Sequence, residues 1–299
     1  MAHSHTQAHG DHYYVPPPSA WPFFTTMGLV AFFVGFGNWL NGLAAGEATG
    51  LYRILFAGGL MWVIFMAWIW FRGVIGENEA GVYNLQVDRT FRWSMSWFIF
   101  SEVMFFGAFF GALFYARALA VPWLGGEGAK FSTNEFIWPS FEALWPTNGP
   151  GAIGGDFDII PAWGVPFLNT IILLSSGVTI TIAHWGLKEN NRAKLIWGLV
   201  ATVALGCLFL FFQAEEYIHA YRELNLTLGS GIYGSTFFML TGFHGAHVTL
   251  GTIMLIVILG RCIKGHFTEE RHFGFEGVAW YWHFVDVVWI GLFIFVYVI

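Results

Sequence analysis

Charged residues are scarce in this sequence, and their scarcity excludes most soluble folds. Asp, Glu, Lys and Arg make up 11% of the 299 residues, 56% are hydrophobic, and the mean hydropathy is +0.59. A soluble domain carries about 25% charged residues, so most of this surface must face lipid. The net charge is −6 and the basic residues form no patch suited to nucleic acid, so no nucleic-acid partner is expected.

Cysteine is nearly absent as well. Cys207 and Cys262 both lie in or at the end of apolar segments. They form neither a disulfide framework nor a C-x-x-C metal site, and we interpret them as small buried hydrophobic residues.

The first 20 residues contain no Lys or Arg. The first apolar segment therefore lacks the cationic region of a secretory signal, and we expect it to be retained. The preceding tail has four histidines and then three prolines, which is more typical of a solvated tail than of a metal site. These residues are His3, His5, His9, His12 and Pro16 to Pro18.

Long hydrophobic runs are what the sequence has in abundance. A helix needs about 20 mainly apolar residues to cross a bilayer, and seven segments qualify. They lie near residues 20–43, 52–71, 93–116, 164–187, 195–214, 231–260 and 277–299. The sequence therefore predicts an all-α polytopic membrane protein with seven transmembrane helices.

The basic residues between these segments predict the orientation. With the N-terminus inside, nine of the 13 Lys and Arg residues fall on the inner side and four on the outer side. Cytoplasmic loops carry such an excess, so we expect an inner N-terminus and an outer C-terminus. The inner set is Arg72, Arg89, Arg92, Lys188, Arg192, Lys194, Arg261, Lys264 and Arg271, and the outer set is Arg53, Arg117, Lys130 and Arg222.

The expected organisation has four parts. Residues 1–19 form the inner tail, 20–71 the first two helices, 72–92 an inner loop, and 93–299 the remaining five helices. The last part includes a long outer loop, 118–163, which is rich in Gly, Pro and Trp and carries five acidic residues. That loop either meets a partner protein or caps the helices.

Glu102 is an acid inside an apolar segment. Placing a charged side chain in hydrocarbon costs at least about 2.5 kcal/mol even on the mildest free-energy scale. Such a group therefore usually faces protein or marks a functional site. Its neighbours Phe105 and Phe106 favour the neutral, protonated carboxyl, which could exchange protons or react with hydrophobic carboxyl reagents. A buried acid bonded to a neighbouring helix is the alternative.

Two histidine-containing pairs also lie inside apolar segments. His244 and His247 share one helical face, as do His283 and Asp286. Hydrogen bonds across helices explain both pairs as structural polar groups. The sharper alternatives are a proton relay at His283 and Asp286, and a metal site joining the histidines to Glu102, Glu216 or His219. A di-metal centre needs two Glu-x-x-His motifs, and only Glu216 with His219 supplies one.

Short cationic clusters follow two of the segments. Arg261, Lys264, His266 and Arg271 form one, and Arg72, Arg89 and Arg92 form another. Juxtamembrane cations hold anionic lipid headgroups at about 1 kcal/mol each. Plain determination of topology is the alternative for any one of them.

Taken together, these stretches resemble the subunit III family of the cytochrome c oxidases, within the heme–copper oxidases. The resemblance spans nearly the whole chain and is most specific in its last third. The matching stretches are Pro18–Pro22, Ser101–Phe106, Pro166–Thr170, Ser176–Thr181, Gln213–Tyr217, Tyr233–Phe238, Thr241–Val248, His272–Glu276 and Ala279–Trp289.

The resemblance implies a fold and a role. It implies seven helices in two groups, one to two and three to seven, forming a V-shaped cleft that holds phospholipids. It implies a core subunit with no catalytic centre and no metal of its own, which stabilises subunit I and sustains proton uptake into it. Heme A and copper would lie in the partner subunits I and II, with cytochrome c as electron donor to the complex.

The resemblance also implies roles for particular residues. Glu102 looks like the family's carbodiimide-reactive carboxylate. The positions expected near lipid headgroups are Glu77, Arg92, Arg261, Lys264 and His266. The segment Trp70–Glu77 departs from the family pattern, which weakens the expectation of lipid contacts there.

Two further features bear on source and class. The 118–163 loop is long for a mitochondrial member of the family that the chain resembles, and the resemblance therefore favours a protein of the bacterial inner (plasma) membrane over one of the mitochondrial inner membrane. A proton-coupled transporter using Glu102, His283 and Asp286 is the competing class, but such proteins tend to have inverted repeats and broken helices, and we find neither in the sequence.

Overall fold

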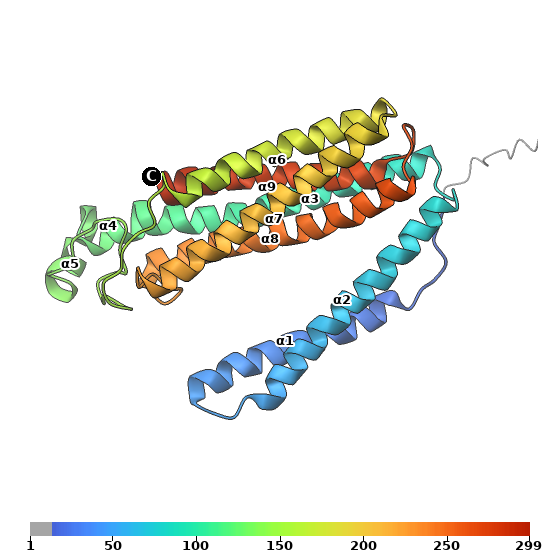
Figure 1. The fold of residues 1–299 in the computed structure, drawn as a ribbon. Helices are drawn as coiled ribbons and strands as arrows, with labels where there is room; N and C mark the ends of the chain where they lie inside the picture. The colour runs from blue at the N-terminus through green and yellow to red at the C-terminus, as the bar shows by residue number, and fades with distance from the viewer. Residues whose placement is uncertain (1–13) are drawn as a thin grey trace, which may run out of the picture. The chain divides into compact units, whose positions relative to one another are not determined.

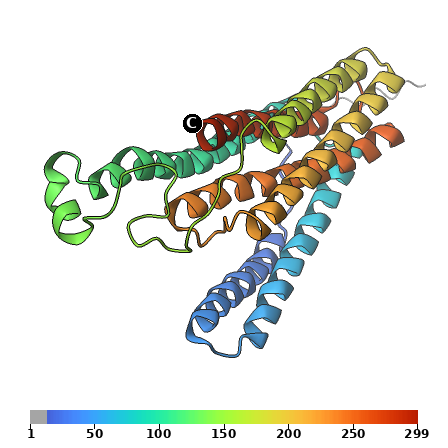
Figure 2. The same cartoon turned by 60° about the vertical axis from the view of Figure 1, so that its left-hand side comes forward.

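The computed structural model describes residues 14–299. The four tail histidines lie outside the described residues, so the expectation of a solvated tail is not addressed. Within the described part the chain is helical and has no strand, and seven helices are long and apolar enough to cross a membrane (Figures 1 and 2). The predicted number of seven is confirmed. The chain divides into two compact units, residues 1–91 and 92–299, and each is described by itself.

The first unit is a helical hairpin of α1 (Trp21–Ala45) and α2 (Gly50–Glu79). Its contact is built on glycine, because the only buried residues of α1 are Gly28, Gly35 and Gly42. A Cβ at Gly35 would overlap the backbone of Phe56, and one at Gly59 would overlap the backbone of Phe32. Small residues let two helix backbones approach closely in lipid, where no hydrophobic effect drives helices together.

Gly35→Leu is therefore expected to open this hairpin. Overpacking a tight contact costs about 1–3 kcal/mol, so amide hydrogen exchange in α1 and α2 should become about tenfold faster or more. Exchange measured by mass spectrometry on the purified chain reads each helix separately. Gly37→Leu is the matched control, because nothing lies within 4 Å of a Cβ at Gly37. Equal exchange in the two variants would contradict a glycine-dependent contact.

The second unit is a bundle of long helices. Its members are α3 (Leu85–Tyr115), which starts just before the unit boundary, α6 (Val165–Lys188), α7 (Arg192–Arg222), α8 (Gly231–Lys264) and α9 (Phe273–Leu292). The helix pairs α6 and α7, α7 and α8, α8 and α9, and α6 and α9 are in contact (Figures 1 and 2). Helix α9 is the most buried span, and the Trp282 and Trp289 side chains on it are fully buried.

Short elements continue α3 and α9. The five-residue π-helix η1 (Ala116–Ala120) leads from α3 into α4 (Val121–Leu124), and η3 (Phe293–Val298) extends α9. The predicted outer loop at 118–163 contains α4, the 3-10 turn η2 (Gly128–Lys130) and α5 (Phe131–Ile137) before it becomes irregular. Asn225 beyond α7 fastens this loop, because its side-chain amide donates to the carbonyl oxygens of Gly154 and Asp156 at 3.1 and 2.8 Å.

Several helices extend beyond the ends of the predicted apolar segments. Helix α2 continues to Glu79 and α3 begins at Leu85, so only residues 80–84 of the expected loop at 72–92 are non-helical. Helix α7 likewise reaches Arg222, beyond the segment near 195–214. Hydropathy marks where a helix enters lipid, whereas the backbone hydrogen bonds that define its end continue into the interface.

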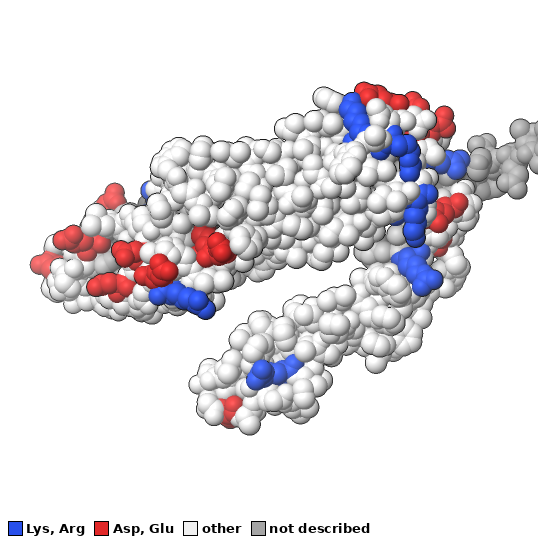
Figure 3. Space-filling model, viewed as in Figure 1, with Lys and Arg blue, Asp and Glu red and all other residues white. Residues whose placement is uncertain are grey.

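The charged side chains of the second unit gather near its two ends (Figure 3). The turn between α6 and α7 carries Lys188, Arg192 and Lys194, and Arg192 donates to the carbonyl oxygens of Cys262 and Ile263 at the end of α8. Over α4 and α5, at the opposite end, acidic side chains gather on the face seen in Figure 3. The long surface between the two ends is almost free of charge in that view, as a lipid-facing surface must be.

Candidate functional site

Glu102 and His247 form an ion pair between α3 and α8. Glu102 Oε2 lies 3.0 Å from His247 Nε2, and the ring of Phe105 packs beside the imidazole. The Glu102 side chain is 21% exposed, and its neighbour Met104 is exposed outright. The Glu102 carboxyl is therefore partly exposed at the surface of the second unit.

Hydrogen-bond counting shows that this pair holds a proton. His247 Nδ1 lies 2.6 Å from the carbonyl oxygen of Phe243, and a carbonyl can only accept, so Nδ1 carries hydrogen. A neutral ring would then point a lone pair from Nε2 at the carboxylate of Glu102, which is repulsive. A further proton must lie between them, either on the ring or on the carboxyl. The pair is neutral overall in both cases, which is what low-dielectric surroundings require.

His244 has a different role from its neighbour three residues on. Its Nε2 lies 3.1 Å from the Val285 carbonyl oxygen of α9, to which it donates, and its ring packs on Trp289 and Phe209. The side chain is buried and tied to one backbone group. His244 thus joins α8 to α9, while His247 joins α8 to α3.

His283 and Asp286 are brought together on α9. His283 Nδ1 lies 3.5 Å from Asp286 Oδ2, and His283 Nε2 lies 3.3 Å from the hydroxyl of Thr181 on α6. Asp286 is buried, and a Cβ at Gly177 would overlap its carboxylate. The arrangement links α6 to α9 through polar groups, and Gly177 leaves the space that the carboxylate fills.

The acids and histidines considered for a di-metal site are dispersed. The buried Glu216 accepts hydrogen bonds from Tyr297 at 2.6 Å and from Gln213 at 3.2 Å. His219 instead pairs with the exposed Glu223 through Nδ1 at 3.0 Å. Glu102 and His247 are the only two members of that proposed set that the described structure pairs. The sequence did not predict the hydrogen bond between Glu216 and Tyr297, because the two residues are far apart along the chain.

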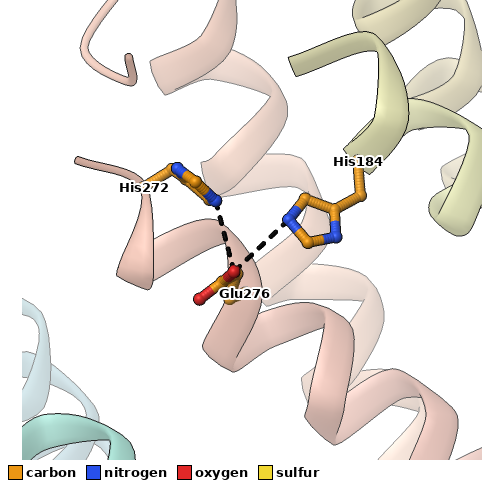
Figure 4. A group of neighbouring side chains, drawn as sticks. All are labelled: His184, His272 and Glu276. Carbon is orange, nitrogen blue, oxygen red and sulfur yellow. Dashed lines mark ion pairs between the residues drawn. The ribbon is translucent and has the colours of Figure 1, made fainter. Parts of the chain in front are cut away.

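A second cluster that sequence reasoning missed lies at the basic end of the second unit. Glu276, in the first turn of α9, forms an ion pair with Arg92 of α3 through Oε2. Its other oxygen, Oε1, lies 3.2 Å from His272 Nε2 and 3.5 Å from His184 Nε2 (Figure 4). We call these four residues the Glu276 cluster. The spacing of His272 and Glu276 places both on one helical face, but nothing local connects them to α3 or α6.

The residues expected near lipid headgroups occupy several positions. Glu77 accepts a hydrogen bond from the Tyr83 hydroxyl at 2.6 Å, and burial together with that bond raises the pKa of Tyr83, so the phenol stays a donor. Arg92 belongs to the Glu276 cluster. Arg261 lies over the ring of Phe267, 4.3 Å from its centroid.

The other two expected lipid contacts lie at the same end of the second unit. Lys264 is the last residue of α8 and is exposed, and His266 follows Gly265, whose φ of +80° ends the helix. Their position at a helix end beside the α7 start fits contact with headgroups rather than with acyl chains.

The matches to known proteins cover nearly the whole chain. The family model described as cytochrome c oxidase subunit III matches residues 11–299. Cytochrome c oxidase subunit 3 of Pongo abelii is 40% identical over 294 residues, which is 97% of this chain and 98% of that protein. The proteins of the same name from Marchantia polymorpha and Arabidopsis thaliana are 38% and 37% identical over 286 residues, 95% of each chain. Together with its seven apolar helices, these matches show that the chain belongs to the cytochrome c oxidase subunit III family.

Proposed function

We propose that this chain is the non-catalytic subunit of a cytochrome c oxidase that packs on subunit I, retains phospholipid and sustains proton uptake during turnover. The observation that carries the proposal is the family match along 11–299. Oxygen reduction would take place at heme A and copper held by subunits I and II, with cytochrome c as donor. What this chain contributes is a scaffold of helices and the charges at their ends.

Exposed apolar side chains support the retention of lipid. Helices α1 and α2 expose large hydrophobic residues along their length, among them Phe33, Ile54, Met61 and Trp68. Such a surface needs acyl chains or another subunit against it. At the basic end, Arg261, Lys264 and His266 supply the donors and charge that headgroups need. The cleft between the two groups of helices, which the resemblance implies, stays a prediction.

The Glu102–His247 pair supports a role near proton movement. It lies at the lipid-facing edge of α3 and shares a proton between two groups, and either group can carry it. The proton can move between Glu102 and His247 without changing the net charge of the pair. We assign Glu102 as the reactive carboxyl on this basis.

Membrane placement follows from charge. We propose a bacterial plasma membrane location with the N-terminus cytoplasmic and the C-terminus periplasmic. The excess of basic residues at the end of the second unit that holds the α6–α7 turn supports this orientation. The long loop between α3 and α6 supports a bacterial rather than a mitochondrial setting.

Purification of the tagged chain in mild detergent tests the proposal. We expect two catalytic oxidase subunits in the peptide mass spectrum, heme A bands in the optical spectrum, and phospholipid in the lipid extract. The double variant Arg261→Ala and Lys264→Ala should keep the partners but lose part of the lipid, and its activity should decay after fewer turnovers.

One control variant sharpens this experiment. Lys130→Ala with Arg222→Ala removes two charges at the opposite end and should leave lipid and turnover number unchanged. A colourless chain that purifies alone, from membranes that contain the oxidase, would refute the accessory role. An unchanged lipid content in the Arg261 and Lys264 variant would refute the headgroup assignment alone.

A further inference from the structure

We propose that His184, His272 and Glu276 form a binding site for a divalent cation of the zinc type. Three potential ligand atoms converge there from two helices: Nε2 of His184 on α6, Nε2 of His272 before α9, and Oε1 of Glu276 in α9 (Figure 4). All three atoms lie within 4.8 Å of one another. The site uses this chain's own residues and does not depend on the role proposed above.

The distances fit zinc coordination. Ligands about 2.0–2.1 Å from a tetrahedral zinc are roughly 3.3 Å apart. Glu276 Oε1 lies 3.2 Å from one imidazole nitrogen and 3.5 Å from the other. Two edges of the tetrahedron are therefore already formed. A small rotation of the His184 ring, the more exposed of the two, would close the third.

The tautomer of His272 is set for a cation. Its Nδ1 lies 3.1 Å from the carbonyl oxygen of Thr268, to which it donates, so a neutral ring points a lone pair from Nε2 at Glu276. This is the arrangement that metal-binding histidines use, in which a backbone carbonyl holds the outer nitrogen and orients the ring. Buried Nε2 atoms of His272 and His184 have no hydrogen-bond partner within the described part of the chain. The lone pair that a neutral His272 ring points at the Glu276 carboxylate requires a positive charge between the two groups.

The surroundings define the kind of cation and the expected affinity. Two imidazoles and one carboxylate are ligands that suit Zn²⁺, and a fourth position remains for water. Arg92 binds the other oxygen of Glu276 and fixes the carboxylate, as outer partners of metal ligands do. Its positive charge also opposes a second cation, so we expect zinc that exchanges with solution rather than a permanent structural ion. His184 is 21% exposed, which provides a path of entry.

The test measures Zn²⁺ bound by the full-length chain with whatever partners it retains in mild detergent. Because the tail histidines can also bind zinc, every protein tested carries His3, His5, His9 and His12 changed to Asn. After treatment with chelator and gel filtration, ZnCl₂ is titrated and the bound zinc is counted by mass spectrometry of the metal. We expect about one zinc for each chain, and imidazole scattering in the zinc-edge X-ray absorption spectrum.

Two variants decide the outcome. His184→Gln leaves the Arg92–Glu276 pair in place, and it should raise the Kd for zinc by at least about tenfold and reduce the imidazole scattering. His219→Gln removes a histidine that contacts an exposed carboxylate outside the cluster, and it should change neither. If the parent protein binds no zinc, or if His184→Gln binds as well as His219→Gln, the cation between these groups is a proton and the proposal is wrong.

Discussion

Glu102→Gln is expected to abolish carbodiimide labelling of this chain while the oxidase still assembles. Carbodiimides attack protonated carboxyls, and the Glu102–His247 pair holds a proton at a partly exposed site on α3. Glutamine removes the reactive acid but retains a donor for His247 Nε2, so the contact between α3 and α8 survives. Peptide mass spectrometry of labelled membranes gives the modified residue, and co-purification of the catalytic subunits reports assembly.

Glu216→Gln is the matched control for the labelling experiment. Glu216 is also an acid within a spanning helix, but it is buried among Gln213 and Tyr297 and a reagent in the lipid cannot reach it. Labelling should therefore persist in that variant. Labelling that persists unchanged in Glu102→Gln would remove the assignment of Glu102 as the reactive carboxyl.

Trp282→Ala should be among the most destabilising single changes in the chain. The Trp282 side chain is fully buried and its Nε1 donates to the Ser176 hydroxyl of α6 at 2.8 Å. Its ring lies against Gly206 of α7 and Gly251 of α8, where a Cβ would come within 3 Å of it. Truncating a buried tryptophan costs about 3–5 kcal/mol, and glycine neighbours offer no side chains to fill the cavity.

The two cysteines make this loss measurable. Cys262 is buried and Cys207 is exposed, so in a Cys207→Ser background a thiol-reactive dye reports only the opening of the second unit. We expect Trp282→Ala to lower the temperature at which Cys262 becomes labelled by about 10 °C. Trp197→Ala removes a tryptophan of α7 that is 72% exposed and should leave that temperature nearly unchanged. A similar shift in both variants would show that Trp282 does not hold the helices together.

The length and hydropathy of the apolar segments predicted the helices, because a membrane span is defined by its own residues. Each span satisfies its backbone hydrogen bonds internally, so composition over about 20 residues is enough to find it. The ends were less well predicted. Helix α2 runs on to Glu79 and α7 to Arg222 because a helix does not stop where its hydrophobic side chains do.

Partners of the polar residues were predicted only when they lay on one helix. The spacing of His283 and Asp286 placed them together, and the structure has them 3.5 Å apart. The spacing of His244 and His247 showed a shared face but not that each bonds to a different helix. The ion pair of Arg92 with Glu276 joins two helices, and the sequence did not predict it; the expected contact of Arg92 with lipid headgroups stays a prediction.

The sequence by itself determined that this is a seven-span membrane protein and which spans carry acids and histidines, because those properties belong to single segments. Its motifs also pointed to the family that the comparisons show. Only the tertiary structure decided that Glu102 meets His247 and that His184 and His272 face one carboxylate oxygen. These side-chain contacts depend on how the packed helices are rotated and shifted along their axes relative to one another. Small differences in interhelical packing energy, spread over many residues, set that geometry, and no local pattern records it.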